Sequence, residues 1–400
     1  MFSFTRIIPY FFFKMARKVN SRTLIKYLPI SILLVFAALQ FILILRHKTP
    51  YLSDSYFYKQ LYYQMKGDSY EKARKRIMGQ VDLKNSDEIT RNFFIKNESY
   101  DYSFSFFKKR PFYPAISVII SIFFTEYVSL ILPIFISYIA IFILLFLLLK
   151  NFLNSFFLYL LLALLIAYYP FLDWSTYILT DTIGFVFWII QLILIYQFIN
   201  KGEKKFLIYY LVTLGVSFFN REESILMLPL SLILLCIYYF LGKSKLIIIR
   251  IRKIAFSTFA LAFFYIFISF LLKERNFYET LLYNQNYFGL YHNNYSFSQT
   301  MNFVLKSIAD VHVAFFKDLF THHWWVLFST IAFVGIIENV FIVKKKELMS
   351  FLIFSSGIAS YLIIFIHPVF SYRYFYPILL MCLFFSVKFI QDFFEKYAGD

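Results

Sequence analysis

Residues 128–149 read VSLILPIFISYIAIFILLFLLL, a run without one charged side chain. A helix needs about 20 mostly apolar residues to cross the roughly 30 Å of hydrocarbon in a bilayer. An isolated segment inside hydrocarbon satisfies its backbone hydrogen-bonding groups by forming a helix. The stretch therefore predicts a membrane-spanning helix, and an all-α membrane protein is the first expectation for the chain.

The composition of the whole chain agrees with a lipid environment. Of the 400 residues, 60% are hydrophobic and 16% are charged, whereas soluble domains contain about half apolar and about a quarter charged residues. The net charge of +17 does not indicate nucleic acid, because the basic residues cluster between the apolar runs. Both cysteines lie inside apolar runs, so we expect neither a disulfide framework nor a cysteine-based metal site.

Similar apolar runs recur along the chain and predict a polytopic membrane protein with about ten transmembrane helices in one domain, residues 1–400. An eleventh apolar stretch, 111–124, is short and begins Pro-Phe-Tyr-Pro directly after Arg110, and we expect it to form an interfacial or re-entrant helix. The ten runs are 28–45, 128–149, 152–170, 174–199, 206–219, 224–241, 254–272, 324–343, 349–367 and 374–391.

The basic residues predict the orientation of these runs. Cytoplasmic loops carry an excess of Lys and Arg, and with ten spans every basic short loop falls on the side of the N-terminal tail. Both termini are then cytoplasmic, and two long loops, 46–127 with interfacial helices and 273–323, lie on the outer side. The basic residues in question are Arg6, Lys14, Arg17, Lys18, Arg22, Lys26, Lys150, Lys201, Lys204, Lys205, Lys243, Lys245, Arg250, Arg252, Lys253, Lys344, Lys345 and Lys346.

Two acidic residues lie near the outer membrane boundary in this topology. Asp54 occurs in YLSDSYFY, residues 51–58, either as a solvated loop residue or as a group that does chemistry at the lipid boundary. Asp181 is expected about two turns inside the fourth span. A charge near the bilayer centre costs about 2.5 to 10 kcal/mol or more, so Asp181 either fixes helix packing through a polar partner or forms the floor of an outer cavity.

Three arginines lie on the same predicted side. Arg221, in FFNREESILMLP (218–229), either pairs with a following glutamate at a helix start or binds phosphate with its planar fork. Arg373 is flanked by tyrosines, so it is either an interfacial anchor or a phosphate ligand. Arg110 and its neighbour Lys109 either contact lipid headgroups or flank a lipid-phosphate site.

The order of these features resembles the GT-C superfamily of multi-spanning glycosyltransferases. The resemblance covers most of residues 28–391. It rests on five motifs: SDSYFY (53–58), RPFYP (110–114), YYPFLDWSTYILTDTIGF (168–185), FFNREESILMLP (218–229) and SYRYFYP (371–377). Many relatives show an acidic pair in the first outer loop, where this chain has the single Asp54 at the loop's mouth.

The resemblance implies transfer of a hexosyl or pentosyl group from a polyprenyl-phosphate donor to a glycan, lipid or protein acceptor. Asp54 would be the general base, or help to hold a divalent cation, and Asp181 the second catalytic acid, a role for which Asp173 competes. Substrate contacts are expected from Tyr58, Lys109, Arg110, Asp173, Arg221 and Arg373. No metal ligands are assigned, and the expected partners include membrane lipids but no nucleic acid. The expected location is a bacterial plasma membrane, with the active site on its outer face.

Three other classes of membrane protein share buried charges and outer loops. A transporter or flippase of lipid-linked saccharides often has repeated halves and Gly- or Pro-broken helices, whereas this chain has only 10 glycines and no visible repeat. A polymerase or ligase of lipid-linked saccharides would use a lipid diphosphate donor. A structural membrane subunit would have no catalytic site.

Overall fold

A computed structural model describes residues 21–82, 91, 94–241, 244–272, 274, 277–286, 293–321, 323–342, 347–365, 367 and 371–397. These residues form helices and connecting turns without a strand, so the predicted all-α class is confirmed for the described part of the chain. The basic residues predicted to mark the cytoplasmic side at 6–18, 243 and 344–346 lie outside the described residues.

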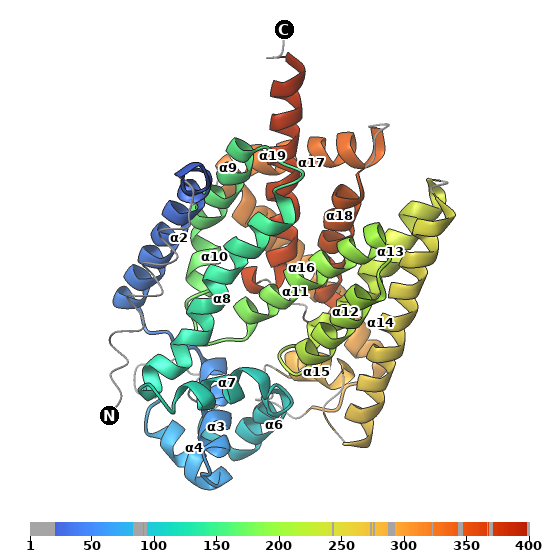
Figure 1. Ribbon diagram of the computed structural model, residues 1–400. Helices are drawn as coiled ribbons and strands as arrows, with labels where there is room; N and C mark the ends of the chain where they lie inside the picture. Colours follow the sequence, from blue (N-terminus) through green and yellow to red (C-terminus); the bar gives the residue numbers. More distant parts are fainter. Residues whose placement is uncertain are drawn as a thin grey trace.

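Seven helical segments among the described residues are long and apolar enough to cross a membrane (Figure 1). They indicate an integral membrane protein, and they coincide with seven of the ten predicted runs. The segments are formed by α2 (Ser21–His47), α8 (Glu126–Leu149), α11 (Asp181–Lys201), η2 (Glu222–Leu226) with α13 (Met227–Phe240), α14 (Lys245–Leu271), α18 (Leu348–Tyr361) with η4 (Leu362–Phe365), and η5 (Tyr372–Phe375) with α19 (Tyr376–Tyr397).

The other three predicted runs are helical but shorter. Run 152–170 is divided between α9 (Ser155–Ala167) and α10 (Tyr169–Trp174), and run 206–219 forms α12 (Lys204–Phe218). Run 324–343 forms α17 (His323–Ile336) and the π-helical turn η3 (Ile337–Ile342).

The predicted start of the fourth span at residue 174 is wrong. Residues 175–180 form turns, and α11 begins at Asp181. Ser and Thr side chains offer the backbone local hydrogen bonds that compete with a helix, and here Thr176 Oγ1 donates to the carbonyl of Asp173 at 2.7 Å. Asp181 is therefore the first residue of its helix, not a residue two turns inside it.

The two long loops contain six described helices. In Figure 1 the helices of loop 46–127 gather at one end of the molecule, and α15 lies beside them. The stretch predicted as an interfacial or re-entrant helix forms α7. The helices are α3 (Ser53–Met65), α4 (Tyr70–Met78), α6 (Asn97–Lys108), α7 (Phe112–Ile120), α15 (Phe277–Gln285) and α16 (Phe297–Thr321).

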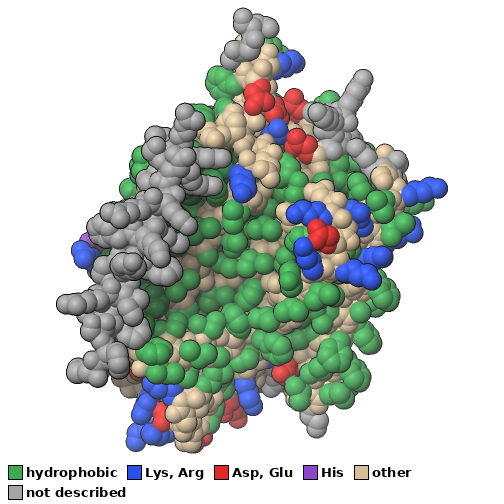
Figure 2. All heavy atoms as spheres, viewed as in Figure 1, with side chains coloured by type: hydrophobic (Ala, Val, Ile, Leu, Met, Phe, Trp, Pro, Cys, Tyr) green, Lys and Arg blue, Asp and Glu red, His purple; other side chains and the backbone are tan. Residues whose placement is uncertain are grey.

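The apolar body is held together by close helix packing. Helix α11 lies between α8 and α12, and α19 packs against α17 and α18. Gly335 of α17 faces the backbone of α19 so closely that a methyl group there would overlap the carbonyl oxygen of Phe385. Figure 2 shows hydrophobic side chains over the middle of the visible face, with charged side chains gathered toward its ends and one side. This distribution is the one expected of a body surrounded by hydrocarbon.

Candidate functional site

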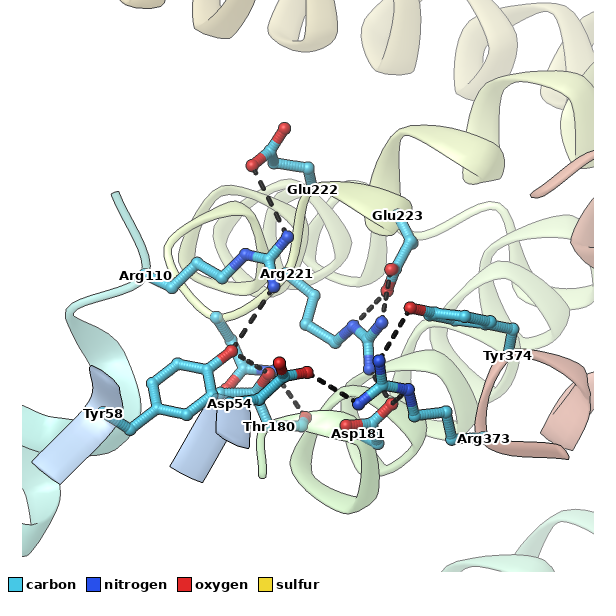
Figure 3. A network of polar contacts seen from close by, with 11 residues as sticks. Asp54, Tyr58, Arg110, Thr180, Asp181, Arg221, Glu222, Glu223, Arg373 and Tyr374 are labelled. Atoms are coloured by element: carbon cyan, nitrogen blue, oxygen red, sulfur yellow. Dashed lines mark hydrogen bonds and ion pairs between the residues drawn. The ribbon is translucent and has the colours of Figure 1, made fainter. Parts of the chain in front are cut away.

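A polar cavity lies between the helices of loop 46–127 and the apolar body. It has a volume of about 880 Å³, including the part open to solvent. Its wall contains Asp54, Asp181 and the three predicted arginines, which come from segments far apart in the sequence (Figure 3). The other lining residues are Tyr58, Phe106, Phe107, Leu179, Thr180, Glu222, Glu223, Thr280, Tyr283, Asn284, His367 and Tyr374.

The connection between α2 and α3 brings Asp54 to this cavity. Lys48 donates to both the carboxylate and the backbone carbonyl of Asp173, each at 2.7 Å. Two residues further on, the carbonyl of Pro50 accepts from the backbone N–H of Ile178 at 2.9 Å. The connection is thus fixed along the turn that precedes Asp181, and Asp54, in the first turn of α3, faces the start of α11.

Asp181 and Arg221 form a buried ion pair at the base of the cavity. The carboxylate belongs to the first residue of α11, where the helix dipole favours a negative charge. Arg221 Nη1 binds Asp181 Oδ1, and the side chain also binds Glu223 through Nε and Nη2. The predicted pairing of Arg221 with a following glutamate is thus found for Glu223, whereas its second partner, Asp181, is distant in sequence and was not predicted.

The turn between α12 and η2 orients Arg221. Its backbone N–H donates to Ser217 at 2.8 Å, and the Asn220 side chain donates to the carbonyl of Thr180 at 3.1 Å. Gly184 leaves room for the arginine, because a methyl group at this position would be 3.1 Å from Arg221 Cδ. Sequence reasoning missed Asn220, although its place beside Arg221 in the same turn was a usable signal.

Arg373 joins the two predicted catalytic acids. It lies in η5, ahead of the last long helix, and its Nη1 donates to Asp54 Oδ2 at 2.9 Å. Its Nε is 4.0 Å from Asp181 Oδ1. The guanidinium lies over the rings of Trp174 and Tyr374, at 5.4 and 4.9 Å from the ring centroids. Arg373 is thus a cavity residue with aromatic neighbours, rather than a side chain that extends from the protein into the lipid boundary.

Arg110 forms the opposite wall with Lys109 beside it. Arg110 Nη1 is 3.4 Å from the Tyr58 hydroxyl, and Nη2 is 3.9 Å from Glu222 Oε1. The same carboxylate oxygen binds Lys109 Nζ at 2.7 Å. Burial alone would lower the pKa of Arg110, but Tyr58 and Glu222 raise it above its ordinary value. Arg110 is therefore a permanent positive charge on this wall.

Tyr58 and His367 supply uncharged polar groups. The Tyr58 hydroxyl is hydrogen-bonded to Thr180 Oγ1 at 2.9 Å, which joins α3 to the turn before α11. His367 is stacked on Tyr374 with 5.4 Å between ring centroids. Burial, followed by the charges of Arg110, Arg221 and Arg373, lowers the pKa of His367 to about 3. His367 is therefore a neutral imidazole at physiological pH.

Two of the predicted substrate-binding residues do not line the cavity. Asp173 is paired with Lys48, with 2.7 Å between Nζ and Oδ1, so it holds the connection that positions Asp54. Lys109 lies behind the wall, bound to Glu222. Sequence reasoning missed Lys48, and nothing in its sequence context distinguishes it from the other basic residues near helix ends.

A divalent cation does not fit this arrangement. No group of three His, Cys, Asp or Glu side chains among the described residues could hold a metal ion. The carboxylates of Asp54 and Asp181 are instead engaged by Arg221 and Arg373.

The arrangement combines groups for proton transfer with groups for binding an anion. Asp54 is partly exposed to the cavity and is able to accept a proton, whereas the three arginines offer forked donors that suit phosphate. Comparison with known proteins finds no matching family model, curated protein or solved structure. What can be inferred about the function therefore depends on the geometry of this cavity.

Proposed function

We propose that the protein is a membrane glycosyltransferase that moves a sugar from a polyprenyl-phosphate donor to an acceptor hydroxyl. The single observation that carries the proposal is the convergence of Asp54, Asp181 and three arginines on one cavity. These residues come from five segments of the chain, between residues 54 and 373. Ionisable residues in or near a membrane body are costly and commonly mark functional sites.

The chemistry assigns different roles to the acid and to the arginines. The acceptor oxygen forms a bond to the anomeric carbon, while the bond from that carbon to the donor phosphate breaks. Asp54 takes the proton of the acceptor hydroxyl and later releases it to water. The leaving lipid phosphate keeps the bonding electron pair, and the guanidinium groups stabilise its developing charge. Asp181 holds Arg221 and Arg373 in place for this role.

The surroundings of the cavity support a lipid-linked donor. A second chamber has a volume of about 470 Å³, including the part open to solvent, and shares Asp181, Arg221, Glu223, Arg373 and Tyr374 with the polar cavity. It is otherwise lined mainly by apolar side chains, Phe185, Trp188, Leu226 and Ile363 among them. A ligand that has both an anionic group and an apolar chain would match the two chambers. A water-soluble sugar nucleotide would leave the apolar chamber unused.

We also propose the finer topology. Ten spans place loops 46–127 and 273–323 on the outer side, with both termini in the cytoplasm of a bacterial plasma membrane. The three shorter helical runs, 152–170, 206–219 and 324–343, would complete the ten. The apolar character of these runs and the basic turns between them support this assignment.

The decisive experiment uses purified protein, a polyprenyl-phosphate sugar and a panel of hydroxyl acceptors. We expect release of free lipid phosphate that depends on an acceptor. Asp54→Asn should reduce the rate at least about 100-fold, because the base is lost, without changing expression or the melting temperature. Asp68→Asn is the matched control, since Asp68 is also paired with an arginine, Arg76, at 2.8 Å in the same loop but outside the cavity.

Two results would contradict the proposal. Full transfer activity in Asp54→Asn would exclude Asp54 as the base. Movement of a lipid-linked saccharide across proteoliposomes without any sugar transfer would favour a flippase instead.

A further inference from the structure

Each basic side chain in the cavity wall or directly behind it already contacts a carboxylate. The basic groups are Lys109, Arg110, Arg221 and Arg373, and the carboxylates are Asp54, Asp181, Glu222 and Glu223. Four positive and four negative charges therefore balance before any ligand binds. An incoming phosphate therefore competes with these carboxylates for the arginines.

The three arginines differ in how readily each can exchange a carboxylate partner for phosphate. Arg221 uses Nε and both Nη atoms on two carboxylates and is buried. Arg110 is only 3.9 Å from Glu222, and this glutamate keeps Lys109 if Arg110 turns away. Arg373 holds Asp54 through Nη1 alone, and its Nε is 4.0 Å from Asp181 Oδ1, which is longer than the contacts that Arg221 makes with its two carboxylates. Arg110 and Arg373 are therefore the arginines available to phosphate.

The two acids near Arg373 differ in exposure. The Asp54 side chain is 27% exposed, whereas the Asp181 side chain is 3% exposed. A carboxylate that reaches water recovers part of its hydration when it loses its partner, but a buried one does not. Of the two acids, Asp54 is thus the one that can be displaced at low cost.

We propose that the donor phosphate displaces Asp54 from Arg373, so that the base is released only when the donor is bound. This inference rests on the proposed function, because it assumes that the site takes an isoprenyl phosphate and uses Asp54 as the base. Before binding, an Asp54 oxygen is occupied by the arginine (Figure 3). After the exchange both of its oxygens face the cavity, where the acceptor hydroxyl arrives second.

The test measures binding instead of turnover. Farnesyl monophosphate is titrated into the detergent-purified protein and its dissociation constant is determined by calorimetry. If Asp54 competes with phosphate for Arg373, Asp54→Asn should bind the probe about two- to fivefold more tightly, the range for a partly exposed ion pair. Asp54→Ser should do the same, which covers the case in which one variant folds poorly.

Further variants separate exchange from a merely structural ion pair. Arg373→Gln should weaken binding, and Asp54→Asn should give no tightening in the Arg373→Gln background. Asp68→Asn, which removes the similar pair with Arg76 away from the cavity, should leave the dissociation constant unchanged.

The outcomes distinguish this inference from the proposed function. Unchanged or weaker binding in both Asp54 variants would overturn the exchange but leave the transferase proposal standing. If the unmodified protein does not bind farnesyl monophosphate, both the exchange and the transferase proposal are wrong. Tighter binding in the Asp54 variants that persists in the Arg373→Gln background would assign the competition to another arginine and overturn the role of Arg373.

Discussion

At the scale of single residues, Gly184 limits the position of Arg221. It lies one turn after the first residue of α11, on the face against which the arginine side chain rests. The Arg221 guanidinium binds Asp181 and Glu223 at once, so a small shift of its stem would change both ion pairs. The size of residue 184 is therefore coupled to the geometry of the charged cluster.

We expect Gly184→Ala to lower the rate of sugar transfer by about tenfold, because displacement of a substrate-binding group by a fraction of an ångström weakens catalysis. Its melting temperature should stay close to that of the unmodified protein, since Ala favours the helix. Gly215→Ala in α12 is the control, because the nearest side-chain atom to an added methyl there is Leu261 Cδ2 at 3.9 Å. Equal transfer rates for both variants would show that Gly184 does not constrain Arg221.

At the scale of helices, α19 carries much of the packing of the body. Small residues let helices approach closely where lipid gives no hydrophobic driving force between them. Gly335 of α17 meets the carbonyl of Phe385, and Gly357 of α18 meets the Met381 side chain. Arg373 lies in η5, which leads directly into α19, so the packing of α19 also bears on where this arginine lies.

Gly335→Ala should destabilise the protein by about 1–3 kcal/mol, the usual cost of overpacking. The added methyl would meet a backbone carbonyl group, with 3.0 Å to the carbonyl carbon, and backbone cannot rotate away as a side chain can. Thermal unfolding in detergent measures the effect. The helical Gly215→Ala variant again serves as the reference, and a melting temperature for Gly335→Ala equal to that of Gly215→Ala would contradict the expected clash.

At the scale of the whole molecule, the cavity lies where the loop helices meet the apolar body. The helices of loop 46–127 form one end of the molecule in Figure 1. The turn between α11 and α12, with Lys201 and Lys204, is at the far end of α11 from Asp181. If α11 crosses the membrane, the charged residues of the cavity and this basic turn must lie on opposite sides.

Single-cysteine labelling tests this arrangement. In a background with Cys236→Ala and Cys382→Ala, we expect Lys66→Cys at the end of α3 to react with an impermeant maleimide in intact cells. Lys201→Cys at the end of α11 should react only after the cells are permeabilised. Both residues are exposed in the structure. Labelling of Lys201→Cys alone in intact cells would show that the orientation is opposite to the one proposed. Labelling of both variants in intact cells would show that α11 does not cross the membrane.

The sequence was sufficient for the helical class and for most of the elements. The long apolar runs predicted helices at 28–45, 128–149 and 374–391 because hydrocarbon leaves the backbone no other local partner. The sequence was not sufficient for the start of α11. Residues 174–180 are largely apolar, but 175–180 form a turn whose side chains and backbone make hydrogen bonds outside a helix. Hydropathy records the environment of a residue and not its backbone hydrogen bonds.

The residues of the candidate site could be selected from the sequence, but their contacts could not. Charge in an apolar context was enough to select Asp54, Asp181, Arg110, Arg221 and Arg373 from the sequence alone, because such residues are costly near lipid. Only the tertiary structure decided which of them meet. The pairing of Arg373 with Asp54 spans 319 positions of the chain. The candidate acid Asp173 is paired with Lys48 and lies outside the cavity. Partners so distant in sequence are set by how the helices pack, which no local pattern of residues encodes.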